Sequence, residues 1–286
     1  MKIKKILLFF IIYLIGFVSP VFLFKTFPQL KNYGRGLKVS EEYKDFKKSA
    51  EKHKYWAKKL SEGGYFLHIR HGMREKWETV TGFDTLELIN GADAREEDYY
   101  RAVCLTEKGV IESKLVGEIF EKANIDLSFI VSSPSCRARE TAIFAFNKID
   151  QVEPSILHRT AQHPSQHIDL GKKFRAVIDD IPIVEGKNVL ISGHGGTLSY
   201  DLKNNVGIVD VNEVSSIDSR KETGIIIIER KNGKYIARHK FDAIHELANT
   251  LDLPIDNPDP KQFIFDKDSK YKPDNIKKGF QGMLPH

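Results

Sequence analysis

The chain has 286 residues, of which 41% are hydrophobic and 29% are charged, and this composition is typical of a folded protein with a substantial core. It shows no internal repeat and no low-complexity tract. The formal charge is +5, but residues 1–40 hold seven Lys or Arg and no acid, so the remainder is close to −2. The basic excess is therefore no footprint of a nucleic-acid-binding protein, and no nucleic-acid partner is expected.

The N-terminus is predicted to be a single-pass membrane anchor. Residues 6–24 carry no charge, and a helix of that length is about 28 Å long, enough to cross the hydrocarbon core. A cleaved signal peptide is the alternative for residues 1–24, but the run ends in bulky residues before Lys25 rather than in small ones. Three lysines among the first five residues favour a cytoplasmic N-terminus. The folded domain is then expected outside the cytoplasm, in the periplasm if the cell is Gram-negative.

Residues 25–62 are predicted to form a linker and then a lead-in helix over 41–61, because apolar residues recur there at helical spacing. From residue 63 to 241, runs of strand length alternate with segments of helix length, which predicts a three-layer α/β/α domain. Strands are expected at 65–70, 127–132 and 188–192, helices at 105–124, 135–146, 166–179 and 197–203, and a hairpin at 224–229 and 234–241. Residues 242–286 are expected to be an extension that wraps the domain or folds against a partner.

Two of the expected strands end in a tight turn that carries a histidine. The first ends at Arg70 and His71, and the second leads to His194, which lies between two glycines. Ligands of open α/β sheets bind at the carboxyl ends of the strands. If the two strands lie side by side, His71 and His194 share one site, and this arrangement indicates phosphoryl chemistry.

A third segment has the pattern strand, Ser/Pro turn, helix. Ser133 or Ser135 can cap the helix, and Pro134 suits its start. Arg137 then lies in the first helical turn, near the positive end of the helix dipole, where a phosphate can dock. Its guanidinium can hold two phosphate oxygens at once.

On these motifs the chain resembles the histidine phosphatase superfamily, the phosphoglycerate mutase-like enzymes, over roughly residues 64–241. The family's Arg-His-Gly motif matches residues 70–72, and its Ser-Ser-Pro-x-x-Arg-Ala-x-x-Thr motif matches residues 132–141. Its His-Gly-Gly-Thr motif matches residues 194–197, and its Leu-Thr-x-x-Gly motif matches residues 105–109. The motifs occur in the family's order, each in a strand-turn context.

The resemblance implies a phosphomonoester hydrolase that works without a metal or other cofactor. His71 would attack phosphorus in line and carry the phosphoryl group as a phosphohistidine, which water then hydrolyses. Arg70, Arg137, His194 and Gly195 would hold the phosphate oxygens. A phosphoglycerate-type mutase is the alternative within the family.

The general acid is not identified by its motif. The family often carries a Glu after the Arg-bearing helix, where this chain has Arg159. Glu75, Glu153 and His158 are the candidates, since each can donate a proton near the site. The departure leaves open a substrate whose leaving group needs little protonation, or a tethered domain that binds phosphate as a scaffold and has lost turnover.

Cys104 and Cys136 are the only cysteines, too few for a disulfide framework and without a metal-binding spacing. Packing is their expected role, and a bridge between them outside the cytoplasm is the alternative. Residues 73–104, between the first strand and its helix, are expected either to overhang the site and select substrate or to cover the sheet edge.

The expected partners are a phosphorylated small molecule or an envelope glycan or lipid, together with the membrane itself through residues 6–24. The sequence leaves the oligomeric state open.

Overall fold

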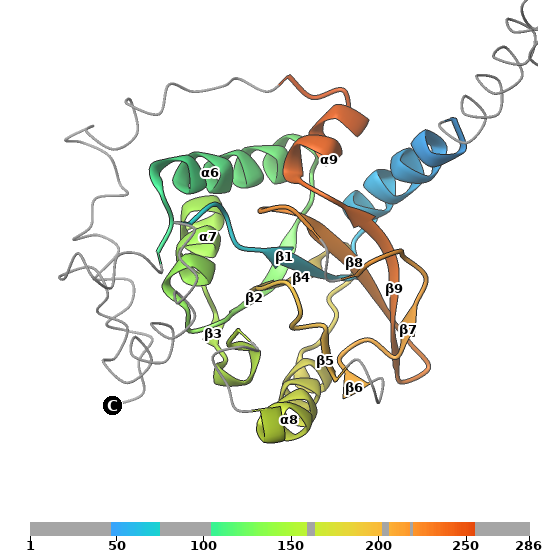
Figure 1. The fold of residues 1–286 in the computed structure, drawn as a ribbon. Coiled ribbons are helices and arrows are strands. Elements are labelled where there is room, and N and C mark those ends of the chain that lie inside the picture. Colours follow the sequence, from blue (N-terminus) through green and yellow to red (C-terminus); the bar gives the residue numbers. More distant parts are fainter. Residues whose placement is uncertain (1–46, 75–103, 159–163, 202–205, 218–219, 255–286) are drawn as a thin grey trace, which may run out of the picture. The chain divides into compact units, whose positions relative to one another are not determined.

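The structure is a computed structural model that describes residues 47–74, 104–158, 164–201, 206–217 and 220–254 (Figure 1). The predicted anchor at 6–24, most of the connection at 73–104 and most of the C-terminal extension lie outside these ranges. Within them, no helix combines the length and the apolar character that a membrane crossing needs. The chain divides into compact units at 1–52 and 53–286, and the second unit holds the sheet described next.

A seven-stranded sheet in the order β3-β2-β4-β1-β8-β9-β7 forms the centre of this unit (Figure 1). The strands are β1 (Phe66–Arg70), β2 (Leu127–Ser132), β3 (Gln151–Val152), β4 (Asn188–Gly193), β7 (Val211–Asn212), β8 (Ile225–Lys231) and β9 (Lys234–Phe241). β1, β2, β3 and β4 run parallel, whereas β8 is antiparallel to both β1 and β9. The two strands that lead to the histidine motifs, β1 and β4, are therefore direct neighbours.

Helices cover both faces of the sheet (Figure 1). One face packs against α6 (Glu107–Lys122), α7 (Cys136–Phe146) and α9 (Ile244–Thr250), and the other packs against α8 (His167–Asp180). β8 shows why the sheet can hold two cores: Ile225 and Ile227 face the first, Ile226 and Ile228 face the second, and all four are fully buried. Side chains alternate along a strand, so a run of four isoleucines fits only a strand covered on both sides.

The α/β fold expected from the sequence is confirmed, with most boundaries within two residues. The described part of the lead-in segment is helical up to residue 62. Two short 3-10 helices, η1 (Pro154–Ile156) and η3 (Pro164–Gln166), lie between β3 and α8 in the sequence.

The helix predicted at 197–203 is wrong. Residues Ser199–Asp201 form strand β5, which pairs with β6 (Val206–Gly207) in a separate two-stranded sheet. Gly196 takes a φ of +85° at the preceding turn, and the carbonyl of Leu198 accepts the Ile208 N–H at 3.0 Å. The backbone there is bonded to a later segment, so it is not available for helical pairing.

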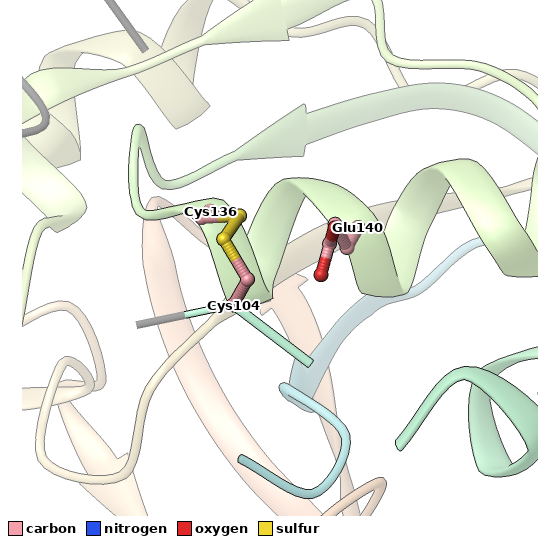
Figure 2. A group of neighbouring side chains, drawn as sticks. All are labelled: Cys104, Cys136 and Glu140. Atoms are coloured by element: carbon pink, nitrogen blue, oxygen red, sulfur yellow. A yellow bond between two sulfur atoms is a disulfide. The ribbon is translucent and has the colours of Figure 1, made fainter. Parts of the chain in front are cut away.

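Cys104 and Cys136 form a disulfide, which corrects the expectation that both cysteines only pack (Figure 2). Cys104 lies just before α6 and Cys136 is the first residue of α7, and the packing of these helices brings the two Cα atoms to 4.8 Å. One turn further along α7, Glu140 accepts the Leu105 N–H at 2.7 Å. The segment that enters α6 is thus attached to α7 by one covalent bond and one hydrogen bond.

Replacing both cysteines by serine should lower the free energy of unfolding by about 3–4 kcal/mol, because the unfolded chain loses a closed loop that spans a sequence separation of 32. Urea unfolding of the wild type and of Cys104→Ser/Cys136→Ser measures the difference. Wild type unfolded with dithiothreitol present should behave like the variant. Equal midpoints for oxidised wild type and variant would exclude a stabilising bridge.

Candidate active site

Three motif turns meet at the carboxyl edge of the central strands. β4 lies between β1 and β2, and its last two carbonyls each accept a hydrogen bond from a neighbouring turn. The carbonyl of Ser192 accepts the Ser133 N–H at 2.9 Å, and the carbonyl of Gly193 accepts the His71 N–H at 3.0 Å. The turns that follow β1 and β2 are therefore tied directly to the strand that leads to His194.

His71 and His194 face each other in this place. Their ring centroids are 5.3 Å apart at an interplanar angle of 62°, and both side chains are buried. The Nδ1 of His71 lies 2.8 Å from the carbonyl oxygen of Gly72. A carbonyl only accepts, so Nδ1 carries the proton and donates it, and the lone pair of this ring lies at Nε2. A histidine in that tautomer can act as a nucleophile.

His194 is held at both ring nitrogens. Arg137 donates from Nη2 to Nδ1 of His194 at 3.3 Å, and Nε2 of His194 lies 2.9 Å from the Ser133 hydroxyl. A guanidinium only donates, so Nδ1 is the acceptor and Nε2 carries the proton. Arg137 comes from the first turn of α7 and is fully buried, which places a positive charge beside both rings.

Thr141 links the turn at His71 to α7. Its hydroxyl accepts the Gly72 N–H at 2.9 Å and donates to the Arg137 carbonyl at 2.7 Å. The motif residue that the sequence placed one helical turn after Arg137 therefore connects the first motif to the second.

Burial holds the pKa of His71 and of His194 well below the usual 6.5, and the positive charge of Arg137 lowers both further. The hydrogen bond from His71 to the Gly72 carbonyl raises the pKa of His71, but only in part offsets this shift. The positive charge of Arg70 lowers the pKa of His71 further. Both imidazoles are therefore neutral near pH 7. For His71, the neutral form is the one with a lone pair to donate.

The guanidinium of Arg70, which was expected to hold a phosphate, already has partners within the protein. Its Nη2 pairs with Glu222 at 3.3 Å, and its Nη1 donates to the carbonyl of Arg220. The side chain is 28% exposed, as is Glu222. Gly195, the other residue expected at the phosphate, is half-buried in the turn after β4.

The candidate acids have different surroundings. Glu153 caps η1: its Oε1 accepts the Ser155 N–H at 2.9 Å, and its Oε2 accepts from Gln151 at 3.3 Å. The His158 ring instead lies 5.2 Å from the ring of His194, at 83°. Glu75 lies outside the described residues. Of the two candidates that the structure describes, His158 is the one at the histidine pair.

Two buried residues behind the pair were not singled out from the sequence. His68, two residues before Arg70 on β1, lies 2.7 Å from the Thr197 hydroxyl and 2.8 Å from a nitrogen of Arg220. A histidine inside an otherwise apolar strand was the available signal for His68. Arg220 stands in a polar segment 152 positions away, and no local pattern marks it.

Among the described residues, one group brings three side chains of metal-ligating types within 4.8 Å of one another: Cys104, Cys136 and Glu140 (Figure 2). The two sulfur atoms are bonded to each other, so in this state neither is a thiolate that could bind a metal. The disulfide also lies next to Arg137 in the chain, and thus attaches the start of α7 close to the histidine pair.

No protein-family model matches the chain, and no curated protein matches it by sequence. Solved structures match with low scores. The product of an open reading frame of Mycobacterium tuberculosis has 16% identity and a TM-score of 0.39, over 61% of this chain and 98% of that one. Phosphoserine phosphatase of Entamoeba histolytica, solved with phosphoserine, has 12% identity and a TM-score of 0.38, over 64% and 98%. A mycobacterial glucosyl-3-phosphoglycerate phosphatase has 13% identity and a TM-score of 0.36, over 58% of this chain and 92% of that one.

Acid should destabilise the fold through three buried histidines, His68, His71 and His194, because burial lowers the pKa of each well below 6.5. The unfolded chain binds more protons, so stability is full above about pH 6.5 and falls below it. Each histidine contributes up to about 1.4 kcal/mol per pH unit.

Urea unfolding of the wild type between pH 8 and 5 measures this slope. His71→Asn should flatten it, whereas His245→Asn, at an exposed position on α9, should not. An unchanged slope in His71→Asn would contradict a buried neutral imidazole.

Proposed function

We propose that the chain is a phosphomonoester hydrolase of the histidine phosphatase superfamily, and that His71 carries the phosphoryl group. One observation supports this most strongly: His71 is buried beside Arg137 and His194 with its Nδ1–H bound to a carbonyl, so that Nε2 keeps its lone pair. A purely structural histidine gains nothing from a second histidine and a buried cation at the same place.

In the proposed reaction, Nε2 of His71 attacks phosphorus and the bond to the leaving oxygen breaks. The phosphoryl group in transfer is mostly charge, so catalysis consists of positioning and neutralising it. Arg137 supplies a buried positive charge, and Arg70 is near enough to lower the pKa of His71 through its charge. Water then attacks the phosphohistidine, the P–N bond breaks, and inorganic phosphate leaves with His71 neutral again.

We propose His158 as the general acid. In the first step its protonated ring donates to the leaving oxygen, and in the second step the neutral ring takes a proton from the attacking water. The position of His158 beside His194 supports this role. The N-cap hydrogen bond of Glu153 argues against Glu153 as the acid, since its side chain already accepts the Ser155 N–H at the start of η1.

A domain that binds phosphate without turnover is the second candidate. The capping role of Glu153 also favours it, because an enzyme without an effective acid hydrolyses only esters with good leaving groups. A phosphoglycerate-type mutase is a further alternative, and dependence of the activity on bisphosphoglycerate would distinguish it.

We also propose that the site works at the cell envelope on a phosphorylated small molecule, glycan or lipid. The uncharged run at 6–24 supports that location, with the N-terminus in the cytoplasm.

His71→Ala should lose at least about 10³-fold in kcat for p-nitrophenyl phosphate, because the nucleophile is gone. Phosphate release by the full chain in detergent measures it. Rapid acid-free quenching of the wild type should trap an acid-labile, base-stable phosphoprotein that is absent from His71→Ala. His245→Ala serves as the matched control and should keep wild-type activity. Hydrolysis that survives in His71→Ala would overturn the proposal.

His158→Asn should lower kcat by about 10²-fold or more for an alkyl phosphate such as glycerol phosphate, because alkoxide needs a proton to leave. The same change should cost much less for p-nitrophenyl phosphate, whose phenolate leaves unprotonated. Glu153→Gln keeps an acceptor for the Ser155 N–H and should leave both rates unchanged. Equal losses on the two substrates in His158→Asn would remove His158 from the acid role.

A further inference from the structure

We propose that Arg220, His68 and Thr197 form a hydrogen-bonded chain that aims the backbone of the His194 turn at the phosphate. Arg220 is then a positioning residue for a site in which it makes no contact with substrate. The inference rests on the proposed function, since it needs a phosphate at this turn.

The direction of every hydrogen bond in the chain is fixed. The Arg220 guanidinium only donates, so Nη2 donates to Nδ1 of His68 at 2.8 Å. The proton of His68 must then lie on Nε2, which donates to the Thr197 hydroxyl at 2.7 Å. That hydroxyl has its own proton left, and donates it to the His194 carbonyl at 2.9 Å. A reversed bond anywhere would leave two donors or two acceptors facing each other.

The last bond of this chain acts on the residue expected at the phosphate. The peptide unit between His194 and Gly195 is planar and trans, so its N–H points opposite to its C=O. Fixing the His194 carbonyl towards Thr197 therefore fixes where the Gly195 N–H points. Backbone N–H groups that are held before the ligand arrives stabilise phosphoryl oxygens without reorganisation.

The surroundings leave the chain little freedom. The three residues of the chain and His194, whose carbonyl ends it, are each at most 4% exposed. A Cβ added at Gly193 would stand 3.0 Å from Nε2 of His68, which is tighter than ordinary contact. The carbonyl of His68 accepts a second donor from Arg220, Nη1, at 3.4 Å. Each of the three bonds from Arg220 to the His194 carbonyl joins one donor to one acceptor, and buried polar networks paired in this way are rigid.

Arg220 also touches the first motif. Its carbonyl accepts from the Arg70 guanidinium, while its own guanidinium begins the chain to His194. Close by, Thr223 donates its N–H to the carbonyl of Arg70 at 3.1 Å. One residue from before β8 thus braces the turns after β1 and β4 together. A residue with only a packing role would have no reason to join these two turns.

Thr197→Val and Thr197→Ser test the chain at its last bond. Valine keeps the shape and removes the hydroxyl, whereas serine keeps the hydroxyl and removes a methyl group. Titration calorimetry of the full chain with orthovanadate should show about ten-fold weaker binding or more for Thr197→Val, and binding within about two-fold of wild type for Thr197→Ser. A packing role alone predicts the reverse order, because valine keeps the shape of the side chain whereas serine leaves the space of a methyl group empty.

Arg220→Met tests the first bond, with Arg230→Met as its matched control. Arg230 lies near the opposite end of β8, where its guanidinium donates to the carbonyls of Ile178, Asp179 and Ile181. Both changes should lower stability, but only Arg220→Met should weaken orthovanadate binding, by about ten-fold. Its loss should not add fully to that of Thr197→Val in the double variant, because both break the same chain. If Thr197→Val does not fold, this pair of arginine variants gives the same comparison.

Three results would overturn the proposal: wild-type affinity in Thr197→Val, an equal loss in Thr197→Ser, or an equal loss of affinity in Arg220→Met and Arg230→Met. If the wild type binds orthovanadate but releases no phosphate from any ester, the proposed hydrolase activity is refuted and the hydrogen-bonded chain from Arg220 to His194 stands. If the wild type hydrolyses esters and Thr197→Val binds orthovanadate as the wild type does, the role of the hydrogen-bonded chain is refuted and the hydrolase activity stands. Wild type that binds no orthovanadate refutes both.

Discussion

The site depends on two consecutive carbonyl groups at the end of β4. The carbonyls of Ser192 and Gly193 accept the N–H groups of Ser133 and His71, and they do so at the point where the central parallel strands end. Each bond joins one of the first two motif turns to β4, the strand that leads to the third motif at His194. Because the anchors are backbone groups of a strand buried on both faces, the separation of the histidine rings is set by sheet geometry rather than by loops.

Electrostatics completes what the backbone positions. A fully buried guanidinium beside two neutral imidazoles gives the site a positive character. Burying such a charge is unfavourable unless something compensates it. The hydrogen bond to His194 is one compensation, and an oxyanion bound beside Arg137 would be a stronger one. Arg70, in contrast, already has a carboxylate partner in Glu222, so its charge is partly balanced before any ligand binds.

Much of this arrangement could be predicted because its signals are local. The run of four isoleucines in β8 is readable as a strand covered twice, and His71, Arg137 and His194 each stand at the end of a strand or the start of a helix. The sequence left open whether β1 and β4 are neighbours, and the structure shows that they pair in parallel.

The remainder could not be predicted because it depends on contacts between distant segments. Cys104 meets Cys136 only through the packing of α6 on α7, and Glu222 meets Arg70 across 152 positions. The segment at 199–201 lies within the helix expected at 197–203, yet its backbone pairs with residues that come later. Arg220 shows the limit most clearly, since only the folded chain reveals that it reaches His68.

The outer strands of the described sheet have a consequence for behaviour in concentrated solution. β3 and β7 have two residues each, so both borders of a seven-stranded sheet end in very short strands. A long, flat border would offer a row of unpaired amides to any other extended polypeptide, and natural sheets commonly shorten it. Growth of this sheet by addition of strands from other molecules is therefore restricted at both borders, which protects the parallel centre from aggregation.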